Sequence, residues 1–249
     1  MKIILSGCNG KMGRVLVKLI NEEKDLEIVA GIDVNHERYE NPFPVYKKAE
    51  YCKEKADVLI DFSHHSALRD VLAYSVKTKT PLVVATTGLS GEDLKALMDA
   101  SKDIPIFQTG NMSLGVNVLT DLAKRASLGL KDFDIEIIEK HHNQKVDAPS
   151  GTAYLIANGI NEVFNDQKEF IYGRYGRSEK RKNSEIGIHA IRGGSIVGEH
   201  TVIFAGPDEI IEIKHTALSK DIFALGAIKA SRFLNVQKNG FYNMNDLLK

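Results

Sequence analysis

The stretch that decides the fold is MKIILSGCNGKMGRVLVKLI, residues 1–20. Residues 2–6 form an apolar run of the kind found in buried parallel strands, and residues 14–20 have the apolar spacing of a helix. The glycines between them follow the pattern G-x-x-G-x-x-G at Gly7, Gly10 and Gly13. Glycine lets a backbone turn tightly and approach a pyrophosphate, which then lies at the N-terminus of the following helix. This order predicts a dinucleotide-binding unit.

Further strand-like runs alternate with helical segments along the first half of the chain. The runs lie at 27–33, 56–63, 81–88 and 104–108, and residues 36–51 form an irregular connection. Ser90 and Asp93 have the spacing of a capping box at the start of a helix. Such alternation predicts a Rossmann-like α/β fold, a doubly wound parallel sheet that binds ligands at the carboxyl ends of its strands.

An acid ends the second of these strands. Asp33 lies about twenty residues after Gly13, where a carboxylate can accept hydrogen bonds from the hydroxyls of an adenosine ribose. The alternative is that Asp33 only caps a turn. An acid here repels a 2′-phosphate, but Lys11 and Arg14 could offset that repulsion. The sequence therefore leaves NADH or NADPH open, with a slight preference for NADH.

The second half of the chain has a different pattern. A helical segment at 114–128 precedes a strand at 133–140, and further strands at 185–192, 198–204 and 209–215 follow without helices between them. This pattern predicts a second α+β domain with a mixed, mostly antiparallel sheet. The expected domains are residues 1–112 with 219–249, which bind the dinucleotide, and residues 113–218, which bind substrate and oligomerise. Residues 172–184 are expected to form a mostly solvated, mobile loop.

The loop after the strand at 133–140 concentrates reactive side chains. It reads EKHHNQKVDAPSGTA over residues 139–153 and leads into a helix. Histidine titrates near neutral pH, and a lysine can give up a proton when its pKa is lowered. A helix N-terminus suits a carboxylate or a phosphate. A single His or Lys in a loop is usually only solvated, but the combination predicts joint proton transfer and anion binding.

This loop resembles the motif E-x-H-H-x-x-K-x-D-A-P-S-G-T-A of the 4-hydroxy-tetrahydrodipicolinate reductase (dihydrodipicolinate reductase) family. Shorter segments also resemble that family: D-F-S at 61–63, A-T-T-G at 85–88 with Ala85 where Gly is usual, G-N-M-S at 110–113 and R-G-G-S-I-V-G-E-H at 192–200. The resemblance implies reduction of (2S,4S)-4-hydroxy-2,3,4,5-tetrahydrodipicolinate by NADH or NADPH, in lysine synthesis through diaminopimelate. It also implies a cytoplasmic homotetramer.

The resemblance implies roles for individual residues. His141 and Lys145 would be the acid–base pair, with Lys145 the stronger candidate for proton donor. The carboxylates of the substrate would bind at His142, Gly151 and Thr152. The cofactor would contact Gly7, Cys8, Asn9, Gly10, Lys11, Met12, Asp33, Ala85, Thr86, Thr87, Thr109, Gly110, Asn111 and Met112. His64 and His65 are expected to be solvated or to cap a helix, and His200 and His215 to be structural. Arg192 could contact a neighbouring subunit or an anionic substrate, but a structural role is favoured.

Composition narrows the possible partners. The chain has 249 residues, with 33 Lys plus Arg and 33 Asp plus Glu, so no nucleic-acid or membrane-binding surface is expected. Cys8 and Cys52 show neither metal-ligand spacing nor a disulfide framework, which fits a reducing cytoplasm and a site without metal. No signal peptide or membrane span is expected.

Two other functions remain open on the sequence. The first is a different NAD(P)-dependent reductase of a carboxylated substrate, for which the glycine-rich turn would serve equally well. The second is a dinucleotide sensor that catalyses nothing. A sensor would need Asp33 but would have no use for His141 together with Lys145.

Overall fold

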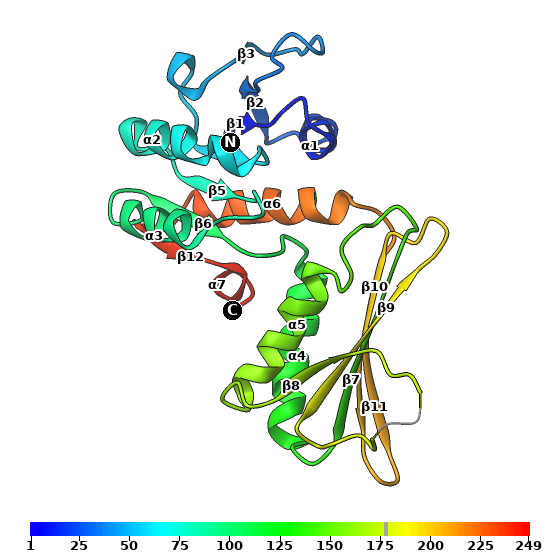
Figure 1. The fold of residues 1–249 in the computed structure, drawn as a ribbon. Coiled ribbons are helices and arrows are strands. Elements are labelled where there is room, and N and C mark those ends of the chain that lie inside the picture. Colours follow the sequence, from blue (N-terminus) through cyan, green and yellow to red (C-terminus); the bar gives the residue numbers. More distant parts are fainter. Residues whose placement is uncertain (177–178) are drawn as a thin grey trace. The chain divides into compact units, whose positions relative to one another are not determined.

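The computed structural model describes residues 1–176 and 179–249 (Figure 1). Arg177 and Ser178, which fall in the loop predicted over 172–184, lie outside the described residues. The chain forms two compact units. Unit 1 comprises Met1–Ser113 and Asp221–Lys249, and unit 2 comprises Leu114–Lys220.

Unit 1 is built on a parallel sheet with the strand order β12-β6-β5-β4-β1-β2-β3. The strands are β1 (Lys2–Ser6), β2 (Glu27–Ile32), β3 (Val45–Tyr46), β4 (Val58–Asp61), β5 (Leu82–Val84), β6 (Pro105–Gln108) and β12 (Gly240–Tyr242). The order of the strands reverses between β1 and β4, and ligands of such sheets bind at the carboxyl ends beside this reversal. The predicted doubly wound parallel sheet is confirmed.

Helices cover both faces of this sheet. They are α1 (Lys11–Glu22), α2 (Leu68–Thr78), α3 (Gly91–Ala100), α6 (Asp221–Leu234) and α7 (Met244–Leu247), with 3-10 turns η1 (Ala49–Tyr51) and η2 (His65–Ala67). Ile4 points into a core that α2 and α3 close, while its buried neighbours Ile3 and Leu5 point to the other face, where α1 packs on α6. The predicted capping box of Ser90 and Asp93 begins α3.

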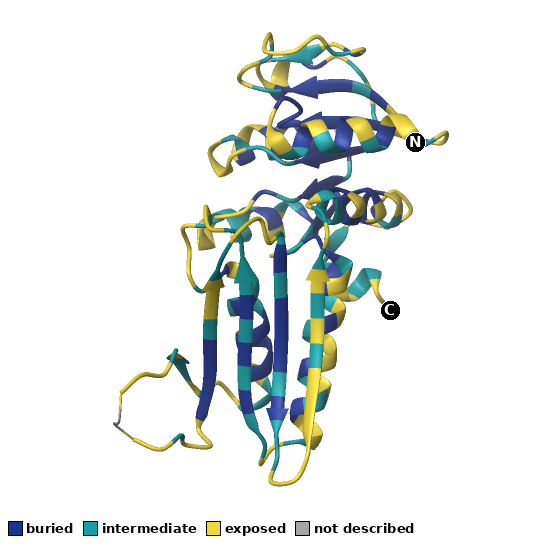
Figure 2. Ribbon diagram, turned by 90° about the vertical axis from the view of Figure 1, so that its right-hand side faces the viewer, coloured by how far each residue is buried: buried dark blue, intermediate teal, exposed yellow. Residues whose placement is uncertain are grey.

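Unit 2 has a five-stranded sheet with the order β11-β10-β7-β9-β8. Its elements are α4 (Leu114–Gly129), β7 (Asp134–His141), α5 (Gly151–Val163), β8 (Glu169–Tyr172), β9 (Glu185–Arg192), β10 (Gly198–Ala205) and β11 (Ile210–Ala217). β9 runs parallel to β7 and β8, whereas β10 runs antiparallel to β7 and β11. The prediction of a mixed sheet is therefore confirmed. Figure 2 shows that burial is concentrated in the central strands and that the edge strand β11 is largely exposed.

The pleat of β7 decides which side chains enter the core. Ile135 and Ile137 are fully buried in a cluster with α4 and α5. Since side chains alternate along a strand, Glu139 and His141 lie on the same face, at the carboxyl end of β7. The core thus ends in a carboxylate and an imidazole beside the start of α5.

Arg174 and Arg181, from the segment predicted to be a solvated loop, are bonded to glutamates on strands. Arg174 donates to Glu136 (3.2 Å) and Glu185 (2.9 Å), and Arg181 donates to Glu136 (2.9 Å) from the same loop. Glu136 lies on the face of β7 opposite the core. These partners are distant in sequence and belong to strands, so local composition could not indicate them.

Candidate active site

The glycine-rich turn after β1 is packed so closely that a side chain at two of its glycines would collide with backbone atoms. Gly7 has φ +78°, and a Cβ there would lie 2.7 Å from the carbonyl oxygen of Phe62. A Cβ at Gly13 would lie 2.1 Å from the carbonyl oxygen of Gly7. Gly10 caps α1 without any side-chain hydrogen bond to the first turn, and this turn carries N–H groups that the helix itself cannot satisfy. The turn therefore fits the pyrophosphate of a dinucleotide.

Asp33 follows β2 with its carboxylate fixed in place. Its Oδ2 accepts from the backbone N–H of Asn9 (2.9 Å), and its Oδ1 accepts from the backbone N–H of Asn35 (2.8 Å). Asp33 therefore does close a turn, as the alternative interpretation held, and it also links that turn to the glycine-rich loop. Both roles are compatible, because a carboxylate has further lone pairs for ribose hydroxyls.

The neighbouring cation is already engaged. Arg14 donates from Nη1 to Oδ1 of Asn41 (2.8 Å), and its guanidinium lies 5.0 Å from the centre of the Tyr39 ring. Val34, which directly follows the acid, is exposed and uncharged. Asp33 can thus accept hydrogen bonds from ribose hydroxyls, while Arg14, expected to offset the charge of Asp33, is bonded to other residues.

Most of the remaining predicted cofactor residues lie in the loops at the carboxyl ends of β1, β5 and β6, while Lys11 and Met12 open α1, and several of these residues use their side chains for packing. Cys8 is completely buried, and burial raises the pKa of its thiol to about 12. Thr86 donates to Oδ2 of Asp61 (2.7 Å) and thereby links β5 to β4. Met112 is buried as well. At such positions only the backbone is available to a ligand. The other predicted cofactor residues are less enclosed: Asn9 is buried, Met12, Ala85, Thr109 and Asn111 are half-buried, and Gly10, Lys11, Thr87 and Gly110 are exposed.

Glu139 is the centre of the polar cluster in unit 2. Its side chain is completely buried, yet it accepts four hydrogen bonds. The guanidinium of Arg192 donates to both oxygens (2.7 and 2.8 Å), and the backbone N–H of Ser150 donates to Oε1 (3.0 Å). Burial raises the pKa of this carboxyl, but the hydrogen bonds from Arg192 and His141 outweigh burial and lower it overall.

His141 is held by this carboxylate. Its Nδ1 lies 2.5 Å from Oε2 of Glu139. Burial lowers the pKa of His141, and the opposing effect of Glu139 does not fully restore it. The ring is therefore largely neutral near pH 7, with its proton on Nδ1, because a carboxylate can only accept. The other nitrogen, Nε2, is left as an acceptor and lies 3.2 Å from the position that a Cβ on Gly198 would occupy.

Lys145 lies in the loop beyond β7 and pairs with Asp147. Its Nζ donates to both carboxylate oxygens of Asp147, at 2.7 and 2.8 Å. The turn after β9 supports this loop, because Gly193 donates from its backbone N–H to the carbonyl of His141 (2.9 Å). Arg192 also donates from Nη2 to the carbonyl of Asp147 (2.6 Å).

The start of α5 closes the cluster. The side chain of Ser150 accepts from the N–H of Ala153 (3.2 Å) and lies 3.1 Å from Nε2 of His200. Gly151 opens the helix with no atom within 4 Å of a potential Cβ, so a ligand can approach closely, and Thr152 is the next residue of the first turn. Nδ1 of His142 is buried and has no hydrogen-bond partner within residues 1–176 and 179–249.

The five residues predicted for catalysis and substrate binding follow one another in unit 2: His141 ends β7, His142 and Lys145 lie in the next loop, and Gly151 and Thr152 open α5. Sequence reasoning assigned no role to Glu139 and treated Arg192 as structural. The signal that could have identified Glu139 is its spacing: a Glu two residues before a His on a strand shares the face of that His. The position of Arg192 beside His141 depends on the register of β7 against β9, which the sequence does not specify.

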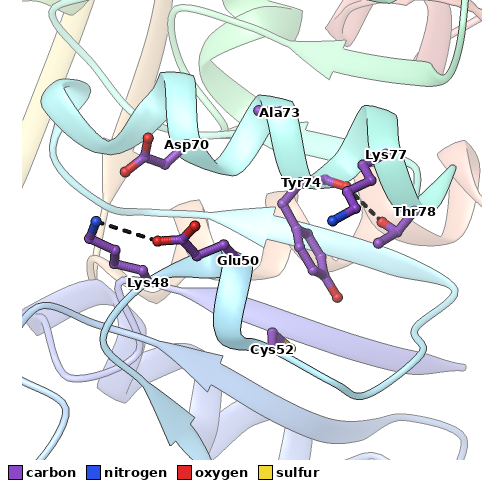
Figure 3. A pocket seen from close by; sticks show the side chains of 8 residues that line it. All are labelled: Lys48, Glu50, Cys52, Asp70, Ala73, Tyr74, Lys77 and Thr78. Atoms are coloured by element: carbon purple, nitrogen blue, oxygen red, sulfur yellow. Dashed lines mark hydrogen bonds and ion pairs between the residues drawn. The ribbon is translucent and has the colours of Figure 1, made fainter.

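A separate cavity of about 580 Å³ lies against η1 and α2 (Figure 3). Its charged residues include Lys48 and Glu50, which pair at 3.4 Å, and Asp70 and Lys77 from α2. The cavity contains none of the residues predicted for cofactor, substrate or catalysis.

Comparisons with known proteins agree in both units. The family model for the N-terminus of dihydrodipicolinate reductase matches residues 1–112, and that for its C-terminus matches residues 115–248. A 4-hydroxy-tetrahydrodipicolinate reductase of Caldanaerobacter subterraneus is 55% identical over the whole chain and 98% of the relative, and one of Clostridium tetani is 52% identical over the whole chain and 97% of the relative.

A solved structure extends the similarity to the fold. A dipicolinate-bound dihydrodipicolinate reductase from Paenisporosarcina sp. TG-14 superposes with a TM-score of 0.82 at 22% identity, covering 98% of each chain. No helix within the described ranges combines the length and apolar character that a membrane span needs.

Proposed function

Since the chain belongs to the dihydrodipicolinate reductase family, we propose that it reduces (2S,4S)-4-hydroxy-2,3,4,5-tetrahydrodipicolinate to (S)-2,3,4,5-tetrahydrodipicolinate and water, with His141 and Lys145 as acid–base pair. The protein is an oxidoreductase of lysine biosynthesis through diaminopimelate. The observation that carries the residue assignment is the Glu139–His141 hydrogen bond beside the loop of Lys145.

The reaction needs a hydride and a proton. Loss of water from the substrate leaves a conjugated imine, and addition of hydride at ring carbon 4 leaves an enamine. The chemistry that a reduced nicotinamide supplies is donation of that hydride. Lys145 donates a proton from Nζ to the carbon next to ring carbon 4. Nε2 of His141 is the second group of the pair and can accept a proton.

The substrate is a dicarboxylate, and the loop offers matching groups. Nζ of Lys145 and Nδ1 of His142 are polar groups of this loop, and the N-terminus of α5 carries a partial positive charge at Gly151 and Thr152. Asp147 holds Lys145 in the free protein, so a substrate carboxylate would replace the Asp147 carboxylate as its partner.

For the cofactor, the expectation is that NADH is preferred to NADPH. Asp33 places a negative charge where a 2′-phosphate would lie, and Arg14, one of the two cations that could offset that charge, is bonded to Asn41. The pyrophosphate would bind at the backbone of the turn from Gly7 to Met12, and the nicotinamide would lie near Thr86, Thr87, Asn111 and Met112. The ratio of kcat/KM for the two cofactors tests this preference.

We further propose a cytoplasmic homotetramer that assembles through the sheet of unit 2. One face of that sheet has no helix packed on it in unit 2, and exposed apolar side chains such as Ile191 and Ile210 lie on its strands. Sedimentation velocity would show a tetramer, and a monomer at micromolar concentration would contradict the assembly.

The decisive experiment is oxidation of NADH and NADPH, followed by absorbance, with substrate made in place by its synthase from pyruvate and aspartate semialdehyde. Lys145→Ala should lower turnover about a hundredfold or more, because a positioned general acid is worth about 10²–10⁴-fold. Lys131→Ala is the matched control, since Lys131 is exposed and precedes the amino end of β7. Near-normal turnover in Lys145→Ala would overturn the assignment.

A further inference from the structure

We propose that buried Glu139 and its half-buried partner Arg192 form a positioning device that fixes both members of the acid–base pair at once. The proposal rests on the assignment of His141 and Lys145 made above. Neither residue of the device needs to touch the substrate, because each acts through a hydrogen bond to the part of the chain that does.

The carboxylate fixes the histidine. Glu139 accepts the proton on Nδ1 of His141, which sets the tautomer and turns Nε2 outward as the acceptor. The same carboxylate accepts the N–H of Ser150 at the start of α5. Rotation of Glu139 would therefore disturb the imidazole and the helix start together.

The guanidinium fixes the lysine loop. Arg192 donates two hydrogen bonds to the carboxylate of Glu139 and a third to the carbonyl of Asp147. Asp147 in turn holds Nζ of Lys145 in the free protein, so the guanidinium fixes the loop from which Lys145 meets the substrate. A planar fork can satisfy the carboxylate and the carbonyl together, which the single ammonium of a lysine cannot do with the same geometry.

Burial makes this geometry rigid. Glu139 is fully buried, so its charge is viable only with its partners in place. Ile137, two positions earlier on β7, shares the face of Glu139 and is fully buried. The device is thus anchored in the core of unit 2.

Several charged or titratable groups face His141. They are Glu139 from β7, Lys145 and Asp147 from the following loop, Arg192 from β9 and His200 from β10, whose ring centre lies 5.3 Å away. Glu139 raises the pKa of His141, whereas Lys145 and Arg192 lower it. Loss of the Glu139 charge should therefore move the titration of His141 to lower pH.

The test uses substitutions that preserve size. Glu139→Gln removes the charge and offers an amide that can donate to Nδ1, which disfavours the required tautomer. We expect kcat to fall about tenfold to a hundredfold and the acid limb of the pH profile of kcat/KM to shift to lower pH. Arg192→Lys keeps the charge but loses the fork, so kcat should fall while that acid limb stays in place.

A matched control lies on the same strand. Glu136→Gln makes the same change at a glutamate that also pairs with arginines, but on the opposite face of β7. Its kcat and pH profile should match those of the wild type. The affinity for NADH, measured by fluorescence, should be unchanged in all three variants, because the predicted dinucleotide residues belong to unit 1.

A measurement on the wild type covers the case in which Glu139→Gln does not fold. The ¹⁵N chemical shifts of labelled histidines, assigned with His141→Asn, should show the Nδ1–H tautomer at His141. An Nε2–H tautomer would overturn the proposal, as would an unchanged kcat and pH profile in folded Glu139→Gln. A wild type that oxidises neither NADH nor NADPH would instead refute the proposed reaction, and the chemical shifts would still decide the positioning.

Discussion

Replacement of Gly13 by alanine is a stringent test of the glycine-rich turn. The new Cβ would lie 2.1 Å from the carbonyl oxygen of Gly7 and 2.7 Å from two backbone atoms of Cys8. Backbone atoms cannot rotate away as a side chain can, so the turn has to retreat by about 1 Å to reach tolerable contact. The helix α1 and the turn would therefore separate where the pyrophosphate is expected to bind.

The size of the effect follows from this overlap. Overfilling a packed site costs about 1–3 kcal/mol, which lowers Tm by about 2–12 °C in a chain of this length. Loss of one hydrogen bond from the backbone to a charged phosphate costs about 1.5–3 kcal/mol, so the Kd for NADH should rise about tenfold to a hundredfold.

The chain provides a matched control in Gly91, the first residue of α3. A Cβ on Gly91 meets no atom within 4 Å, so Gly91→Ala should leave Tm unchanged or slightly raised. Differential scanning fluorimetry and NADH fluorescence titration measure both quantities for the two variants. Equal Tm and equal Kd in Gly13→Ala and Gly91→Ala would refute the reasoning.

Two further predictions concern charge. Asp33→Ala should raise the ratio of kcat/KM for NADPH over NADH about tenfold, because a repulsion of about 1.4 kcal/mol between the carboxylate and the 2′-phosphate is removed. Steady-state kinetics with both cofactors measure this ratio, and an unchanged ratio would contradict the prediction. Burial lowers the pKa of His200 to about 4 from 6.5, so below pH 6.5 the unfolded chain takes up a proton that the folded chain binds only near pH 4. The free energy of unfolding should therefore fall by about 3 kcal/mol as the pH drops through this window. Urea denaturation of His200→Gln at several pH values should show a smaller fall. An equal dependence of the free energy of unfolding on pH in the variant and the wild type would contradict this prediction.

Local patterns account for much of the fold. The strand, turn and helix at the N-terminus were predictable, because the apolar run, the glycines and the helical spacing occur within twenty consecutive residues. The capping box of Ser90 and Asp93 was predictable for the same reason. The alternation along β7 and β9 was also visible, so the mixed sheet followed from the sequence.

The short edge elements were not predictable. β3 (Val45–Tyr46) and β12 (Gly240–Tyr242) have too few residues to show a period of two. β3 is defined by pairing with the preceding strand β2, and β12 by pairing with β6, which is distant in sequence. β8 (Glu169–Tyr172) likewise depends on β9. Tertiary pairing, rather than local propensity, creates these strands.

The active site likewise combines features set by local sequence with contacts that only tertiary pairing creates. The loop from His141 to Thr152 is contiguous, so its chemistry could be read directly from the sequence. The contact between Glu139 and Arg192 joins residues 53 positions apart, and it exists because β9 aligns beside β7 with His141 opposite Arg192. The inward side chain of Cys8 depends equally on packing, since its sulfur occupies the space that a Cβ on Gly31 would need.

The central claim is that this chain transfers a hydride to ring carbon 4 of its substrate. The most direct measurement uses NADH carrying deuterium at the transferred position, with substrate generated in place and the product analysed by mass spectrometry and NMR. The product should carry the label at ring carbon 4, in proportion to the NADH oxidised. Oxidation of NADH without labelled tetrahydrodipicolinate would contradict it.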